Sequence, residues 1–447
     1  AFLEGARRYF KRHAWSNTTL GDLLSVLAET SGRDMAAWSR SWLQTAGVNV
    51  LTPQVSYDSA GRIAELAVVQ EAPEAFPELR PHRVAVGLYR MDETGALVRT
   101  ERAETDVTGA RTVVGELAGA ERPDLILVND EDLTYCKVRF DPGSLATVRR
   151  HLGDITDPLA RALVWSAVWN LTRDALLPAR EYIALVLRFA GRESDIGVLQ
   201  SLHQQARTAL DHYAAPEWRE EGGRLLATGA LDGLRAAEPG SGHQLAWARF
   251  FASTASSGAE LDLLQGLLDG TEEIEGLKVD QELRWTFLEA LAVHGRAGKE
   301  VLDAELARDN TASGERHRMR CLAARPDAAV KAEAWQSVVE SDRLPNALVD
   351  SVIAGFAQPN QRELTAPYAP RYFEALERVW SERTIEIAMR IVRGFFPSLQ
   401  ADRETLDRAD AWLASAPQIP ALRRLVAEAR DDLARDLRAQ ECDRSAG

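Results

Sequence analysis

The sequence predicts a mainly helical protein of several domains, with a small β-sandwich in its first third. Two observations lead to this fold class: the hydrophobic period changes twice along the chain, and 447 residues exceed what one core normally supports. We expect helices over 1–49, a β-sandwich over 50–143 and a HEAT-like α-superhelical (α-α) domain over 144–439. A polar tail over 440–447 should be disordered.

The first 49 residues read as short amphipathic helices. Thr19 and Asp22 form a possible capping box before a leucine-rich helix, and Asp34 can cap the helix that follows. These helices are too short to bury their tryptophans alone, so we expect an exposed apolar patch. The chain begins without Met and with residues typical of a helix interior, which predicts that it is cut from a longer protein.

Residues 50–143 change to the period of β-strands. Val84, Val86 and Leu88 alternate with Arg83, Ala85 and Gly87, and further short apolar runs follow between turn sequences such as Asp92–Gly95. About seven strands in this length favour a small sandwich of two sheets.

From residue 144 the helical period returns and continues to the end of the chain. Asp157 and Pro158 are typical of a helix start, and the helix after them is apolar on several sides, as expected of a buried helix. Breakers recur roughly every 15–25 residues, which favours helical hairpins of HEAT-type size; they include Pro178, Gly191, Pro216, Gly258, Gly270, Gly295, Pro326, Pro345, Pro359, Gly394 and Pro417.

Composition excludes several classes of protein. A net charge of −14 disfavours general nucleic-acid binding, which needs a basic surface. No apolar run is long enough to span a membrane. The three cysteines are too far apart in sequence for a CxxC site or a disulfide framework, which favours a cytoplasmic location.

The chain lacks the commonest zinc-hydrolase motif. A His-Glu-x-x-His sequence places two histidines on one helix face with a glutamate base between them. None of the eight histidines is followed by glutamate, and none has a second histidine four residues on. We therefore predict no catalytic residue, no metal ligand and no bound cofactor within this chain.

Three weaker candidates each have a structural alternative. Ser241 lies near His243, but the surrounding Pro and Gly residues favour a helix connector over a hydrolase site. Cys136 lies in a strand-like run without an evident base, which favours a buried thiol. The acidic run 129–132 lacks the spacing of a calcium loop, and a turn between strands is the preferred interpretation.

Two arginines are the candidate substrate-binding residues. Arg390 and Arg393 lie on a predicted helix over 385–395, and a guanidinium group suits a peptide carboxylate. The alternative is a solvated or salt-bridged helix face.

Three blocks of sequence resemble the aminopeptidase N family, in particular its actinobacterial members. Residues 9–24 and 38–49 are similar to the end of its thermolysin-like catalytic domain, and residues 129–141 to the close of its β-sandwich. Residues 276–285 are similar to a segment of its helical domain. The blocks occur in the family's order, so the resemblance covers essentially the whole chain.

The resemblance implies a zinc metallopeptidase, a gluzincin, that removes N-terminal residues from peptides. In the full-length enzyme the zinc site and the segment that binds the free amine would lie upstream of Ala1. Residues 1–49 would then be the last helices of the catalytic domain, and the missing catalytic portion would pack on them. The helical domain would enclose the active site and control peptide access, and this chain alone would be inactive. The alternative is a stand-alone α-solenoid scaffold that binds protein partners.

Overall fold

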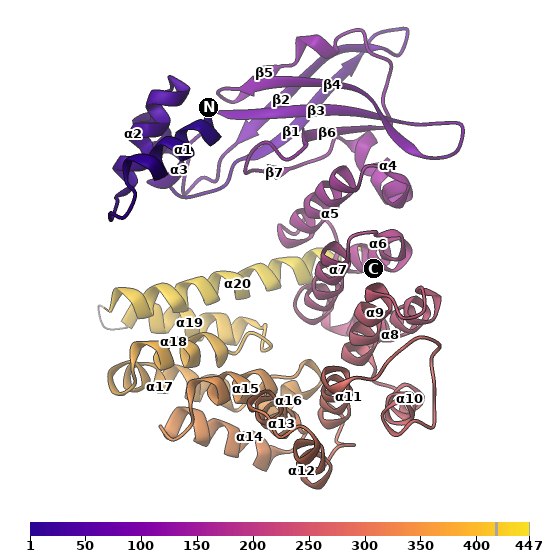
Figure 1. Ribbon diagram of the computed structural model, residues 1–447, viewed down its shortest axis with the longest axis vertical. Coiled ribbons are helices and arrows are strands. Elements are labelled where there is room, and N and C mark those ends of the chain that lie inside the picture. Colours follow the sequence, from indigo (N-terminus) through magenta and orange to yellow (C-terminus); the bar gives the residue numbers. More distant parts are fainter. Residues whose placement is uncertain (416–418, 447) are drawn as a thin grey trace. The chain divides into compact units, whose positions relative to one another are not determined.

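The computed structural model describes residues 1–415 and 419–446, which form two compact units, Ala1–Ala167 and Val168–Gly447 (Figure 1). Pro417, a predicted breaker, and Gly447, the last residue of the predicted tail, lie outside the described residues. The helices of the first unit are α1 (Phe2–Arg12), α2 (Leu20–Ser31), α3 (Met35–Leu43), α4 (Pro142–His151) and the start of α5 (Pro158–Arg173). Its strands are β1 (Val50–Tyr57), β2 (Ile63–Glu71), β3 (His82–Met91), β4 (Leu97–Val107), β5 (Arg111–Val113), β6 (Leu125–Asp130) and β7 (Lys137–Val138).

The strands form two sheets, as the alternating pattern predicts. One sheet has the order β5-β2-β1-β7, and the other has the order β4-β3-β6. Leu51, Leu66 and Val68 of the first sheet share one hydrophobic core with Val86 and Val128 of the second. Face-to-face burial of this kind makes the sheets a β-sandwich. The strand-like run that contains Cys136 forms only the short strand β7, because only Lys137 and Val138 pair with β1.

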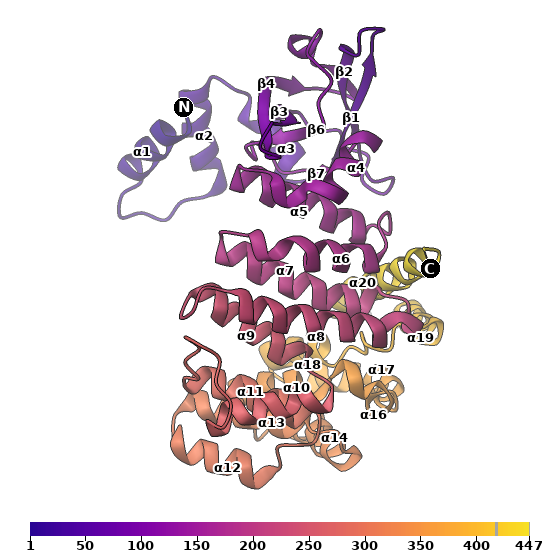
Figure 2. The ribbon, with the colours of Figure 1, turned by 90° about the vertical axis from the view of Figure 1, so that its right-hand side faces the viewer.

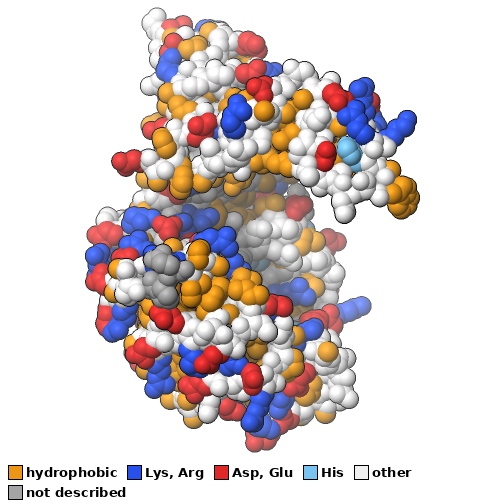
Figure 3. Space-filling view, turned by 90° about the vertical axis from the view of Figure 1, so that its left-hand side faces the viewer, with side chains coloured by type: hydrophobic (Ala, Val, Ile, Leu, Met, Phe, Trp, Pro, Cys, Tyr) orange, Lys and Arg blue, Asp and Glu red, His pale blue; other side chains and the backbone are white. Residues whose placement is uncertain are grey.

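Helices α2 and α3 have the caps that their sequence predicts, while α1 has no side-chain cap. The Asp22 carboxylate accepts a hydrogen bond from the Thr19 amide at 2.8 Å, and Asp34 accepts one from the Ala37 amide at 2.9 Å. These helices also expose large apolar side chains, as expected, and Figure 3 shows hydrophobic side chains over the face of the first unit that carries them. The exposed residues are Phe2, Leu3, Phe10, Trp15, Leu20, Trp38 and Leu43.

The second unit is helical throughout its described residues. After the end of α5, its helices are α6 (Ala179–Phe189), α7 (Ile196–Thr208), α8 (Arg219–Ala236), α9 (Gly242–Thr254), α10 (Gly258–Asp269), α11 (Gln281–Val293), α12 (Lys299–Arg308), α13 (Ala312–Ala324), α14 (Ala328–Trp335), α15 (Asn346–Phe356), α16 (Arg362–Thr365), α17 (Tyr368–Glu382), α18 (Ile385–Gly394), α19 (Arg403–Ser415) and α20 (Pro420–Arg444). A π-helix, Ala209–Tyr213, extends α7.

Helices that follow one another in the chain pack as neighbours, including α6 with α7, α8 with α9 and α10 with α11. Figure 2 shows α6 to α13 stacked in successive layers. The last helix, α20, packs on α18 and α19 and also reaches α6 and the π-helix, so the end of the unit returns to its beginning (Figure 1). Among the described residues, no helix is long and apolar enough to span a membrane.

The prediction of a disordered tail from residue 440 is wrong for the residues that the structure describes. Helix α20 continues to Arg444, and Asp443 is fully buried. The Asp443 carboxylate accepts hydrogen bonds from the amides of Arg180 and Ala215, at 2.8 and 2.9 Å. The Gln440 side chain also donates to the carbonyl of His212 at 2.8 Å. Because all these partners lie more than 200 residues away in sequence, the local polarity of the tail did not reveal them.

Candidate functional site

A pocket with a volume of about 620 Å³ lies in the second unit. The end of α7, the start of α8, the end of α9, α11, α13 and the turn before α16 all contribute to it. Its charged side chains are Arg207, Asp211, Arg219, Glu220, Arg249, Glu289, Arg320 and Arg362, and its polar ones include Thr286, His294 and Asn360.

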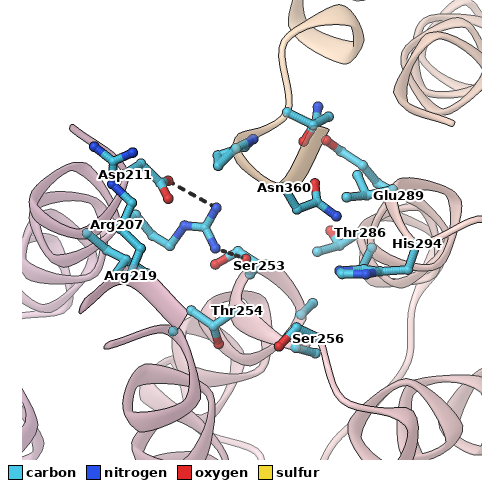
Figure 4. Close-up of a pocket in the computed structure, with 18 of the residues that line it drawn as sticks. Arg207, Asp211, Arg219, Ser253, Thr254, Ser256, Thr286, Glu289, His294 and Asn360 are labelled. Carbon is cyan, nitrogen blue, oxygen red and sulfur yellow. Dashed lines mark hydrogen bonds and ion pairs between the residues drawn. The ribbon is translucent and has the colours of Figure 1, made fainter. Parts of the chain in front are cut away.

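Two of the pocket arginines are paired with carboxylates. Arg207 approaches the Asp211 carboxylate at 3.2 Å and also donates to the carbonyl of Ser253. On another element, the Arg320 guanidinium approaches the Glu289 carboxylate at 2.6 Å. Figure 4 shows two sides of the pocket: Arg207, Asp211 and Arg219 on one, and Thr286, Glu289, His294 and Asn360 on the other.

Two other arginines carry charge that no carboxylate binds directly. Arg362 donates to the carbonyl oxygens of Asp211, at 2.6 Å, and Leu399. The Nε and Nη2 atoms of Arg219 are buried and have no hydrogen-bond partner among the described residues. Burial, with the nearby charge of Arg362, lowers the pKa of Arg219 to about 10, and burial also lowers the pKa of Arg362. Both groups remain protonated at neutral pH. The carboxylates of Asp211 and Asp436 act on both guanidinium groups through space, but neither forms an ion pair with them.

The predicted substrate-binding arginines lie elsewhere, on α18. The Arg390 guanidinium lies 3.1 Å from the Glu386 carboxylate and 3.5 Å from that of Asp350. Arg393 is exposed, and neither arginine lines the large pocket. Arg390 therefore belongs to an ion-pair network, and Arg393 is the more accessible of the two guanidinium groups.

The contacts of Ser241 and Cys136 fit structural roles for both side chains. The Ser241 hydroxyl accepts a hydrogen bond from the Gln244 amide at 3.1 Å and caps α9. Burial, with the Asp132 carboxylate nearby, raises the pKa of the Cys136 thiol to about 12. A thiol protonated at neutral pH is a poor nucleophile. These contacts support the helix connector and a half-buried, protonated thiol over the catalytic alternatives.

The acidic run 129–132 forms a turn after β6. Asn129, Glu131 and Asp132 have positive φ angles, and the amide of Asp132 donates to the carbonyl of Asn129 at 3.0 Å. Arg99 approaches the carboxylates of Asp130 and Glu131 at 2.8 and 3.0 Å. Arginine therefore already neutralises two of the carboxylates that a calcium ion would need.

The sequence blocks with the family resemblance form structural junctions. His82 Nε2 lies 3.2 Å from Asn49 Oδ1, and His82 Nδ1 lies 2.8 Å from the hydroxyl of Thr134. Residues of two separate blocks, 38–49 and 129–141, thus meet around one buried histidine. Burial, with the positive charge of Arg80 nearby, lowers the pKa of His82 to about 4, so the imidazole is neutral at neutral pH.

The third block, 276–285, begins α11 and fixes it to its neighbours. Asp280 caps the helix through the Leu283 amide at 2.9 Å, and Trp285 Nε1 donates to the Asp309 carboxylate at 2.9 Å. Arg284 pairs with the buried Glu305 carboxylate at 2.7 Å. The block is therefore recognisable because it holds the helices together.

The structure offers no set of side chains that fits zinc. Among residues 1–415 and 419–446, no three histidine, cysteine, aspartate or glutamate side chains gather closely enough to hold a metal ion.

Sequence reasoning did not find the large pocket. Its arginines come from segments that are up to about 150 residues apart, and each one alone is typical of a solvated helix face. No local spacing indicates that they meet, because the fold of the whole unit brings them together. A cluster of arginines in a chain of net charge −14 would be a signal of such a site, but the cluster becomes visible only in the folded structure.

Comparison with known proteins identifies the family. Residues 125–435 match the ERAP1-like C-terminal domain family. The chain is 55% identical to the aminopeptidase N of Streptomyces lividans over 452 aligned residues, which cover 100% of this chain and 53% of that protein.

Shorter stretches match two other aminopeptidases. The aminopeptidase G of Streptomyces lividans is 55% identical over 56 residues, 11% of this chain and 77% of that protein. The aminopeptidase N of Lactococcus lactis subsp. cremoris is 43% identical over 58 residues, 13% of this chain and 7% of that protein. The chain thus spans about half of the Streptomyces aminopeptidase N. The chain belongs to the aminopeptidase N family and carries its ERAP1-like C-terminal domain.

Proposed function

We propose that this chain is the C-terminal region of a zinc-dependent aminopeptidase that removes N-terminal residues from peptides. The observation that carries the proposal is the 55% identity to an aminopeptidase N along the whole chain. The described residues provide no ligand set for zinc. Zinc and the catalytic residues would therefore belong to a catalytic region of the longer enzyme, and this chain alone would be inactive.

The role of the second unit in the proposed enzyme is to enclose the active site and to control which peptides reach it. We propose that its paired helices are HEAT-like, a fold that curves and presents a concave surface. The return of α20 to α6 supports this role, because a closed array holds its shape better than an open one. The catalytic region would pack on the apolar side chains of residues 1–49, and three free cysteines favour the cytoplasm.

The access role is tested in a longer enzyme that contains this chain and a catalytic region. We expect this enzyme to cleave the first residue of a free pentapeptide, but to leave the same five residues uncut at the N-terminus of a folded domain. Asp443→Ala, which removes the hydrogen bonds that hold α20 to the start of the unit, should cleave the fused substrate faster. Equal cleavage of both substrates by the unaltered enzyme would contradict the access role.

Binding of a peptide carboxylate by Arg390 and Arg393 stays a prediction. Because Arg390 is already paired, Arg393 is the better candidate. In the longer enzyme, Arg393→Gln should raise KM for a tetrapeptide with a free C-terminal carboxylate by about tenfold, and leave KM for its C-terminal amide unchanged. Equal effects on the two substrates, or no effect on either, would exclude this role.

A further inference from the structure

The large pocket of the second unit carries more positive than negative charge. Five arginines and three carboxylates line it, and burial lowers the pKa of the remaining titratable group, His294, which is neutral at neutral pH. This leaves an excess of two positive charges in a chain whose net charge is −14. Such an excess at a concave site attracts anions.

The excess charge belongs to particular side chains. Asp211 and Glu289 are engaged by Arg207 and Arg320, while Glu220 is exposed. The arginines without a directly bound carboxylate are Arg219, Arg249 and Arg362: the first has buried donors without a partner, the second is exposed, and the third binds backbone carbonyls. A buried guanidinium without an anion is costly, so an anionic ligand would stabilise this arrangement.

The start of α8 adds a further electropositive element. Arg219, Glu220 and Gly223 of its first turns line the pocket, and no side chain caps this helix. The N-terminal end of a helix carries partial positive charge. The Arg219 amide already donates to the carbonyl of Pro216, so the helix contributes its dipole here and not a free amide group of Arg219. No side chain projects from Gly223, which leaves this end of the helix open to a small ligand.

We propose that this pocket binds a phosphate group, either as inorganic phosphate or as the phosphate ester of a small metabolite. A phosphate carries close to two negative charges at neutral pH and presents at least three acceptor oxygens, which matches the excess charge and arginines that come from separate elements. A single carboxylate supplies one charge and two oxygens. The volume of about 620 Å³ leaves room for an organic group beside the phosphate.

The test is calorimetric titration of the 447-residue chain in phosphate-free buffer at constant ionic strength. Inorganic phosphate should bind saturably at one site, and glycerol phosphate should bind more tightly if an ester is the natural ligand. Arg219→Gln and Arg249→Gln should each weaken binding about tenfold. Arg235→Gln, which removes an exposed arginine at the other end of α8 and outside the pocket, should leave the affinity unchanged.

Three results would overturn the proposal: no saturable binding of either probe up to roughly 10 mM, equal loss of affinity in Arg235→Gln, or binding of succinate as tight as that of phosphate. Circular dichroism melts establish that each variant is folded. If Arg219→Gln does not fold, Arg249→Gln decides the matter, because this side chain is exposed. The measurement reads binding and not peptidase activity, so it is independent of the proposed function.

Discussion

At the scale of single residues, buried histidines give the second unit a defined response to acid. The His203 ring stacks on Phe250 with centroids 4.1 Å apart and is 5% exposed. Its Nε2 atom has no hydrogen-bond partner among the described residues, and burial lowers the pKa of His203 to about 3. The neutral ring therefore packs as an aromatic side chain does, and its protonation lowers the stability of the folded state.

This histidine predicts how stability depends on pH. The unfolded chain binds a proton at His203 near pH 6.5, while the folded chain binds it only near pH 3. The contribution is complete above pH 6.5 and is lost as the pH falls toward 3, by up to about 3 kcal/mol at pH 4. His203→Phe should remove that part of the loss, as measured by urea unfolding of the second unit from pH 4 to 8. Parallel stability profiles for the two proteins would contradict the assignment.

At the scale of elements, a close crossing of α13 and α15 depends on one glycine. A Cβ atom at Gly355 would clash with the carbonyl oxygen of Arg320 and lie 2.9 Å from the Ala323 side chain. Gly355→Ala should therefore lower the free energy of unfolding by about 1–3 kcal/mol, since the two backbones must separate. Gly191→Ala is the matched control because its Cβ would meet nothing within 4 Å. Equal midpoints of urea unfolding for both variants would refute this account of the crossing.

Attachment of α20 to the start of the unit is the second prediction at this scale. Asp443→Asn removes the charge that accepts from the Arg180 and Ala215 amides in a fully buried position, so we expect a loss of about 2–4 kcal/mol in the free energy of unfolding. Glu441→Gln, on the exposed side of the same turn, should cost less than about 1 kcal/mol. Chemical denaturation measures both, and a larger effect of the exposed substitution would argue against the buried attachment.

The elements also show what the sequence can predict. Caps act within three or four residues, so Asp22, Asp34 and Asp157 indicate helix starts that the structure contains. The end of α20 could not be predicted in this way, because Asp443 has its partners at Arg180 and Ala215. The pocket arginines were missed for the same reason. Arg219 lies beside the charge of Arg362 only in the folded unit, because the two residues are 143 positions apart in the sequence.

At the scale of the whole molecule, the chain combines two recognisable units with no zinc site of its own among the described residues. The motifs that carry the family resemblance form hydrogen bonds around His82 and Trp285 that join separate parts of the chain. Family membership was therefore predictable from sequence, since such junctions need particular residues. Substrate preference was not, because the chain spans only 53% of its Streptomyces relative.

The central claim is that this chain is the non-catalytic C-terminal region of an aminopeptidase. It is tested most directly by the hydrolysis of leucine p-nitroanilide in the presence of zinc, by the purified chain alone and by the same chain joined to a catalytic region that contains a His-Glu-x-x-His motif. We predict no steady turnover by the chain alone, and turnover by the joined enzyme that a chelator abolishes. Steady, chelator-sensitive turnover by the 447-residue chain alone would contradict the account.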